Sequence, residues 1–423
     1  MDSSFVAQRS KMTSKRARRL LGKGTANGGA VPSSIASAIP QNQEGRQVNN
    51  MLTVIAICAA IMATSIAMAN TAVNDQRPII QMAILLDTSG SMSGLLQQAR
   101  TQLWSVVNEF ATMKKDGKIP ELRVALYEYG KSSIPAEEDY LRMIQPLTND
   151  LDKISEELFA LTTNGSKEYC GTVIKAATEG LAWIDSSEVL KTIFIAGNEP
   201  FTQGNVDYRD SCREAIAKGV TVNTIYCGPH ETGISTNWKD GALLTDGSYT
   251  NIDHNQETVH IDAPQDKEIA LLSAKLNTTY IPYGSLGKEG LSRQAAQDRN
   301  AIGAAVAATI QRSAAKATAQ YVNYSWDLVD ALSNNIVKLE DIKDKDLPET
   351  MQDMSLEERK VHVETNLKQR QDLQKRITEL NTERKQYVAE EMKKLSDKGD
   401  ESLETAMIKA VRLQATRLSF EIE

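Results

Sequence analysis

QMAILLDTSGSMSG, residues 81–94, is the stretch that decides the fold of this chain. The run from Ile79 to Leu86 is almost continuously apolar, which is typical of a parallel strand buried on both faces. Asp87 ends the run, and a helical pattern of apolar residues follows. The stretch therefore predicts a strand, a tight turn that carries Asp87, Ser89 and Ser91, and a helix.

Asp87, Ser89 and Ser91 recur at alternate positions, so their side chains can converge on one ion. One carboxylate and two hydroxyls make an all-oxygen site, which suits magnesium, manganese or calcium rather than zinc. At these residues the chain resembles the von Willebrand factor type A (vWA) family, whose metal-ion-dependent adhesion site opens with Asp-x-Ser-x-Ser after the first strand. The resemblance implies a doubly wound α/β sheet flanked by helices, with these three residues as metal ligands. It also implies a protein partner that offers a carboxylate to the ion.

The rest of the motif departs from the family pattern, in which a later loop supplies a threonine and the end of the fourth strand an aspartate. In the loop 161–171 the resemblance puts Glu168 in the threonine position, with Thr163 and Thr162 as less favoured candidates. The positions that correspond to the aspartate are Gly197 or Asn198, with Glu199 one step on. If Glu168 is a ligand, two anionic groups bind the ion and weaken its attraction for a partner carboxylate. The alternative is a degraded site in which Glu168 is a solvated loop residue.

Strand and helix patterns alternate from about residue 76 to 284, which is typical of a mostly parallel sheet with helices on both faces. The later strands are predicted at Leu122–Tyr129, Leu141–Ile144 (an edge that can be antiparallel), Thr192–Ala196, Val220–Cys227 and Thr279–Tyr283. Ligands of such sheets bind outside the carboxyl ends of the strands, where Asp87 lies. The segment Gly228–Ile261 is interpreted as an insertion, which is a polar surface excursion, a specificity loop or a second cation site.

The N-terminal segment, residues 1–74, predicts export. Residues 1–50 form a basic leader without apolar periodicity, which we expect to be disordered. Residues 51–74 contain an apolar stretch, Met51 to Met68, that ends in a small-x-small pattern. This pattern is typical of a signal peptide, and its length also suits a signal anchor in the membrane. A buried core helix is the alternative. We expect a periplasmic, extracellular or membrane-anchored protein.

The C-terminal part predicts helices, with a helical linker at 285–348 and a charged helical tail at 349–423. The stretch 355–395 has no Gly or Pro. Heptad-like spacing is kept by Leu373, Ile377, Leu380 and Tyr387 but is interrupted by Arg384 and Glu391. This pattern indicates either a coiled coil for self-association or an antiparallel hairpin with Ser402–Phe420. We favour the hairpin because the apolar seam is short.

Composition excludes some functions. The 423 residues carry a formal net charge of −7 without a basic patch interleaved with aromatic residues, which argues against a nucleic-acid binder. The four histidines lack the paired spacing of a zinc site. Cys170, Cys212 and Cys227 permit one disulfide, Cys170 with Cys212 being the most attractive pairing, or three reduced thiols.

We therefore expect an exported, non-enzymatic module that binds a divalent cation, most readily magnesium, and mediates protein–protein interaction. One alternative is a scaffold whose helical tail binds partners and whose metal site is structural or vestigial. A magnesium-dependent hydrolase is a further alternative. It is disfavoured because Ser89 stands where an aspartyl-phosphate site has a second acid, and because no Ser-His-Asp or Cys-His arrangement can be placed.

Overall fold

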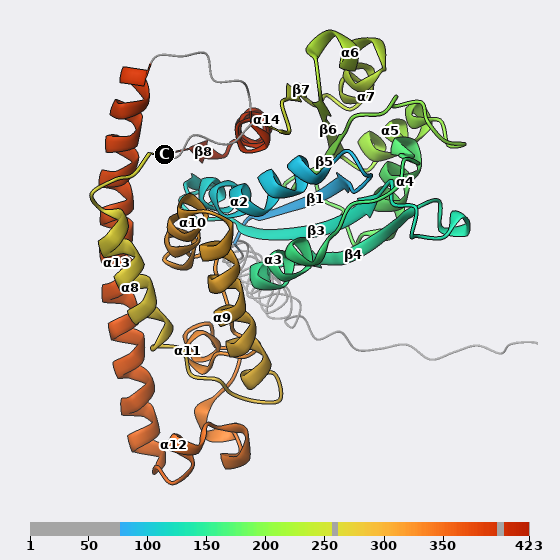
Figure 1. Cartoon of the computed structure of the whole chain (residues 1–423). Coiled ribbons are helices and arrows are strands. Elements are labelled where there is room, and N and C mark those ends of the chain that lie inside the picture. The colour runs from blue at the N-terminus through green and yellow to red at the C-terminus, as the bar shows by residue number, and fades with distance from the viewer. Residues whose placement is uncertain (1–76, 256–260, 396–401, 423) are drawn as a thin grey trace, which may run out of the picture. The chain divides into compact units, whose positions relative to one another are not determined.

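The computed structural model describes residues 77–255, 261–395 and 402–422, which form one compact unit (Figure 1). The predictions for the leader 1–50 and for the signal or anchor segment 51–74 lie outside the described residues. Among the residues that are described, no helix is both long and apolar enough to cross a membrane.

A six-stranded sheet lies at the centre of the unit, with the strand order β4-β3-β1-β5-β6-β7. Its strands are β1 (Ile79–Asp87), β3 (Glu121–Tyr129), β4 (Leu141–Thr148), β5 (Leu190–Gly197), β6 (Val220–Cys227) and β7 (Tyr249–Ile252). Only β3 and β4 pair antiparallel; the other neighbours are parallel. The order reverses between β1 and β5, which is where doubly wound sheets bind ligands. The predicted fold class, including a long helical C-terminal extension, is confirmed.

Helices cover both faces of the sheet. Those within the sheet domain are α2 (Ser93–Phe110), α3 (Leu151–Ala160), α4 (Cys170–Gly180), α5 (Tyr208–Ala217), α6 (His230–Ser235) and α7 (Trp238–Leu243), with the short η1 (Ala136–Glu138). Side chains of β1 alternate between two cores: Met82 and Leu86 pack with α2 and α3, whereas Ala83 and Leu85 pack with α4 and α5. This two-sided burial is the reason for the continuously apolar run.

The chain continues into a helical region. Its elements are α8 (Asp266–Asn277), α9 (Gly287–Ala304), α10 (Val306–Lys316), α11 (Leu328–Ser333), η2 (Leu339–Asp341), η3 (Asp344–Asp346), α12 (Glu349–Gln352), α13 (Leu356–Leu395) and α14 (Leu403–Arg417). The last strand, β8 (Glu421–Ile422), pairs antiparallel with β2 (Met113–Lys114) in a separate small sheet.

The prediction of a sixth strand at Thr279–Tyr283 is wrong. The sixth strand of the sheet is β7, which lies in the segment 228–261 that the sequence suggested was an insertion. The residues 279–283 pack among helices instead, where Tyr280 stacks on Trp326 with ring centroids 5.7 Å apart. Their only strand-like contact described is a single bridge between Pro282 and Asp327. A short apolar run predicts burial, but it does not reveal whether a strand or a helix is the neighbour.

The predicted hairpin between the two C-terminal helices is also wrong. Helix α13 packs along α8, α10 and α11, whereas α14 packs on α2 and on β5, β6 and β7. The backbone amides of Leu403 and Glu404 donate to the side-chain oxygens of Gln98 (3.1 Å) and Gln102 (2.7 Å) on α2. These two amides would otherwise be orphans at the start of α14. The last helix of the chain thus completes the layer that covers one face of the sheet.

The apolar seam of α13 is buried within the same chain. Ile377 and Leu380 belong to the main core, and both are almost fully buried. Arg384, which interrupts the heptad spacing, forms a buried ion pair with Asp266 at the start of α8, 2.6 Å apart. Arg370 lies 2.7 Å from a carboxylate oxygen of Asp327. The seam therefore fixes α13 to the rest of the unit.

Candidate metal centre

The turn after β1 brings the three motif residues together. Asp87 and Ser89 are buried, and Asp87 Oδ1 accepts the backbone N–H of Ser89 at 2.7 Å. The hydroxyls of Ser89 and Ser91 are 3.2 Å apart. Ser91 is exposed, so the turn is open to solvent on that side. Asp87 lies at the strand reversal between β1 and β5, the position expected for a ligand site.

Glu168 lies beside this turn. Two backbone hydrogen bonds join this turn to the loop that precedes α4. They run from Asn164 N–H to Thr88 O and from Gly90 N–H to Gly165 O, both 3.0 Å. Glu168 is 2% exposed, and its Oε2 accepts the backbone N–H of Glu199 at 3.3 Å. The structure therefore places a second carboxyl group against Asp87.

The two threonines of this loop lie differently. Thr163 is half-buried, and the described interactions of the Asp87 and Glu168 carboxyl groups do not involve it. Thr162 is exposed, and its hydroxyl accepts the Lys131 ammonium at 2.9 Å. Of the candidates in the loop 161–171, Glu168 is the one that lies next to Asp87.

Two glycines allow the carboxyl groups to pack against bare backbone. A Cβ at Gly130 would lie 2.8 Å from Asp87 Oδ1 and 2.9 Å from Glu168 Cγ. Gly130 also has a φ of +87°, which disfavours other residues. A Cβ at Gly197 would lie 3.1 Å from Asp87 Oδ2. Larger residues at either position would displace the acidic pair.

The two carboxyl groups compete for one proton. Burial is the largest cause that raises the pKa of Asp87, to about 6. Burial, followed by the charge of Asp87 and a carboxyl–carboxyl hydrogen bond, raises the pKa of Glu168 to about 9. The nearby charge of Glu199 raises both pKa values further. Two adjacent buried carboxylates cannot both ionise without a compensating positive charge.

Two buried oxygen atoms at this site lack a hydrogen-bond donor among the described residues and could bind a cation. Asp87 Oδ2 and Asn198 Oδ1 are buried and accept no hydrogen bond from the described residues, while Asn198 Nδ2 donates to Ser91 Oγ at 3.3 Å. Buried acceptors without donors are costly, and a hard divalent cation would satisfy them. No group of three His, Cys, Asp or Glu side chains suited to a metal occurs in the described residues. A centre here would therefore combine carboxylate, hydroxyl and amide oxygens.

A network of buried charged side chains, not evident from the sequence pattern, fixes these loops. Glu128 on β3 is fully buried and accepts the Thr88 hydroxyl at 3.2 Å. The same carboxylate pairs with Lys131 at 3.4 Å and with Arg142 at 2.5 Å. Lys131 in turn donates to Thr162, so one network joins the turn after β1 to the loop of Glu168. A charged residue next to the end of a largely apolar strand was the available signal. Asn198, by contrast, was already a candidate from its place in the aspartate position.

The three cysteines of the described residues, Cys170, Cys212 and Cys227, are free thiols, and all are buried. Cys170 Sγ lies 3.9 Å from the Tyr129 hydroxyl, behind the acidic pair. Burial raises the pKa of the Cys170 and Cys227 thiols well above their usual range. This is the reduced alternative of the two that the sequence left open, and the pairing of Cys170 with Cys212 does not occur in it.

Among known proteins, the chain is similar only to solved structures. No protein-family model and no curated protein matches the chain. Proximal thread matrix protein 1 from the mussel byssus is 13% identical over 41% of this chain and 41% of that one, with a TM-score of 0.31. The conserved hypothetical protein BatB from Bacteroides thetaiotaomicron is 16% identical over 41% of this chain and 90% of that one, with a TM-score of 0.31. The SpRpn10 VWA domain is 14% identical over 43% of this chain and all of that one (100%), with a TM-score of 0.32. Likeness of this extent says nothing of a metal or a partner.

Proposed function

We propose that the chain is an exported protein-interaction module of the vWA type that binds a divalent cation through Asp87, Ser89, Ser91 and Glu168. The observation that carries the proposal is the buried pair of carboxyl groups, Asp87 beside Glu168, with unsatisfied oxygen atoms around it. A cation would take the place of the shared proton and satisfy these oxygens. The oxygen-only donor set favours magnesium, and manganese or calcium would also suit it.

Partner recognition follows from the charge of such a centre. Two anionic ligands leave a divalent ion with little excess positive charge, so its pull on a partner carboxylate is weak. The partner would then be recognised mainly by the loops around the exposed Ser91, with the ion holding those loops in place. We expect no enzymatic turnover and no nucleic-acid binding.

The remaining parts of the proposal concern export and assembly. We retain the signal peptide or membrane anchor at 51–74, which lies outside the described residues. Self-association through 355–395 also stays a proposal. It would have to use the exposed face of α13, because Ile377 and Leu380 are covered within the chain.

Calorimetric titration of magnesium, manganese and calcium into chelator-treated protein tests the metal assignment. We expect binding by the wild type and none by Asp87→Ala or Glu168→Gln. Glu199→Gln is the matched control, because it removes a neighbouring carboxylate that is not a proposed ligand, and it should bind. Absence of binding by the wild type would contradict the proposal, as would binding that survives both ligand substitutions.

A further inference from the structure

A basic surface lies at the end of the sheet opposite Asp87, where the parallel strands begin. Two cavities of about 400 and 390 Å³ adjoin there and share Ser186 and Val189 in their walls. The cationic residues that line them, here called the basic edge, are Arg77, Lys115, Lys118, Lys191, Lys218 and Arg417. The acids in the same walls are Asp116, Asp185 and Glu188. Six cations against three acids leave an excess of positive charge in a chain whose net charge is −7.

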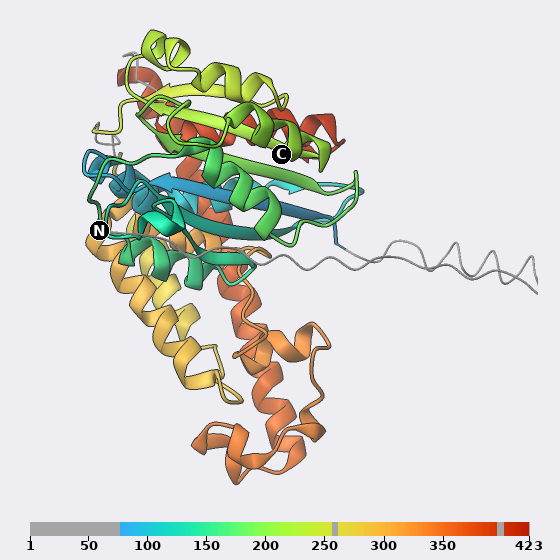
Figure 2. The ribbon, with the colours of Figure 1, turned by 90° about the vertical axis from the view of Figure 1, so that its right-hand side faces the viewer.

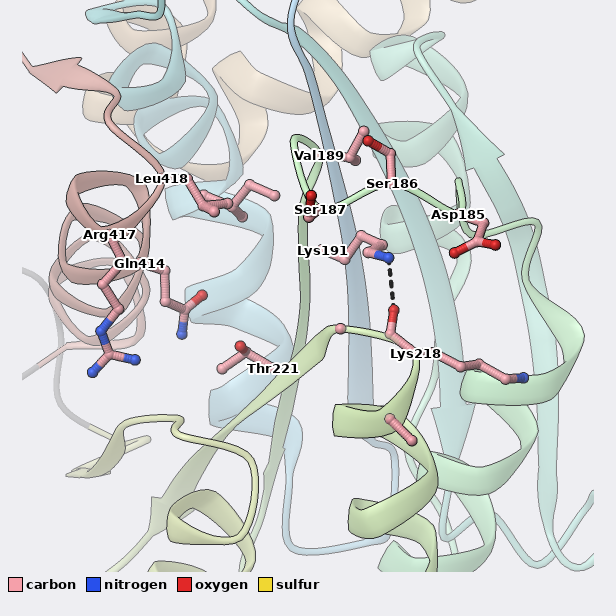
Figure 3. Close-up of a pocket in the computed structure, with 13 residues that line it drawn as sticks. Asp185, Ser186, Ser187, Val189, Lys191, Lys218, Thr221, Gln414, Arg417 and Leu418 are labelled. Carbon is pink, nitrogen blue, oxygen red and sulfur yellow. Dashed lines mark hydrogen bonds between the residues drawn. The ribbon is translucent and has the colours of Figure 1, made fainter.

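Most cations of the basic edge donate hydrogen bonds to backbone carbonyl oxygens. The Lys191 ammonium, which is 7% exposed, donates to Ile184 O at 3.1 Å and to Lys218 O at 2.6 Å (Figure 3). The same kind of bond joins the Lys218 ammonium to Thr178 O (3.0 Å) and the Arg417 guanidinium to Asp246 O (2.9 Å).

Arg77 likewise donates to Ile119 O at 3.1 Å and Pro120 O at 2.9 Å. Lys115 differs, because it pairs with the exposed carboxylate of Glu188 at 2.7 Å. Carbonyl oxygens orient a cation without neutralising it. The edge therefore keeps a positive potential that can attract anions from outside.

The basic edge lies near the start of β1, which follows the apolar stretch Met51–Met68 in the sequence. Strand β1 starts next to Arg77 and ends at Asp87, so the basic edge and the candidate metal centre lie at opposite ends of the sheet (Figure 2). The stretch Met51–Met68 ends nine positions before Arg77. A chain of that length spans at most about 30 Å when fully extended. A membrane that held this stretch would thus lie within reach of the basic edge.

We propose, on the basis of the membrane anchor that the proposed function places at 51–74, that the basic edge binds the phosphate headgroups of anionic lipids in that membrane. Lysine and arginine residues close to a bilayer are attracted to anionic headgroups, and one apolar segment combined with a basic patch is a recurrent two-part anchor. Docking by this edge directs the Asp87 turn away from the lipid. The candidate metal centre then faces soluble or surface-bound partners.

Hydrogen exchange of the full-length chain in lipid nanodiscs tests this. We would compare discs of phosphatidylcholine alone with discs that also contain phosphatidylglycerol, and follow the amides of residues 184–191 and 217–221. The anionic discs should slow exchange there, and high salt should remove the effect. Each cation that is removed should reduce this protection by roughly fivefold.

The test variant is Lys218→Gln with Arg417→Gln, and the matched control is Lys368→Gln with Lys375→Gln on the exposed face of α13. The control should keep the protection. Unchanged far-UV circular dichroism and an unchanged urea-unfolding midpoint of both variants would show that the fold is intact. Equal exchange in neutral and anionic discs, full protection in the test variant, or a chain that does not stay in the discs would each overturn the proposal. Equal protection by inorganic phosphate in detergent would indicate a free-anion site and would also overturn it.

Discussion

Replacement of Met407 by alanine tests whether α14 belongs to the core of the sheet domain. Met407 is 3% exposed, and together with Leu103 and Val106 of α2 it surrounds a small internal gap of about 20 Å³. Loss of three buried side-chain atoms costs roughly 2 kcal/mol in transfer free energy. The cavity left behind adds about 1 kcal/mol or more, because a closely packed neighbourhood relaxes only in part. We expect the free energy of unfolding to fall by about 3 kcal/mol.

Urea unfolding followed by tryptophan fluorescence measures this change, since Trp104 is buried on α2 in the same core. The control is Leu413→Ala in the same helix, where the side chain is 50% exposed. Its effect should stay within about 1 kcal/mol, because little apolar surface is lost. A loss below about 1 kcal/mol for Met407→Ala, or equal losses for both variants, would refute the packing of α14 on α2.

Three other predictions concern the candidate site and the helical region. Gly130→Ala should abolish divalent-cation binding in calorimetry, because its Cβ would meet both carboxyl groups, whereas Gly117→Ala, which has a similar positive φ and open space, should bind normally. In chelated protein the free energy of unfolding should fall as pH rises from about 5 to 9. The pKa of Glu168 is about 9 in the folded state and 4.5 in the unfolded state, so the folded state binds more protons in that range. Thermal denaturation against pH should show that slope in the wild type and a flatter one in Glu168→Gln; equal slopes would contradict the shared proton. Arg370→Met should cost roughly 3–5 kcal/mol in urea unfolding, because it removes the ion-pair partner of the fully buried Asp327 and the partly buried Asp330. Arg376→Met at an exposed pair should cost less than about 1 kcal/mol. Similar costs for the two arginines would show that the buried network contributes no more than a surface pair.

The sheet could be predicted from local patterns because its central strands are buried on both faces. The run 79–86 is apolar except for Gln81, and the strand ending at Tyr129 contains the apolar block Val124–Tyr127, so both patterns predict buried strands. β7 has no such run, since three of its four residues are only half-buried at the sheet edge. The apolar residues at 279–283 looked more like a strand, although their partners are helices.

Long-range packing was beyond the sequence patterns. The apolar face of α14 predicts burial, but nothing local indicates that its partner is α2, some three hundred positions earlier in the chain. At the candidate site, the spacing of Asp87, Ser89 and Ser91 predicted that their side chains lie close together. The place of Glu168 followed from the family resemblance. Glu128 and Gly130 were missed because their roles depend on loops that approach each other only in the folded chain.

Crystals grown with manganese test the metal assignment most directly, because anomalous diffraction locates the ion without assumptions about its ligands. We predict one strong anomalous peak enclosed by the oxygen atoms of Asp87, Ser89, Ser91 and Glu168. The peak should be absent in crystals of Glu168→Gln grown in the same way. A wild-type structure without a peak at that position, or with a peak only elsewhere, would contradict the assignment of this turn as a metal centre.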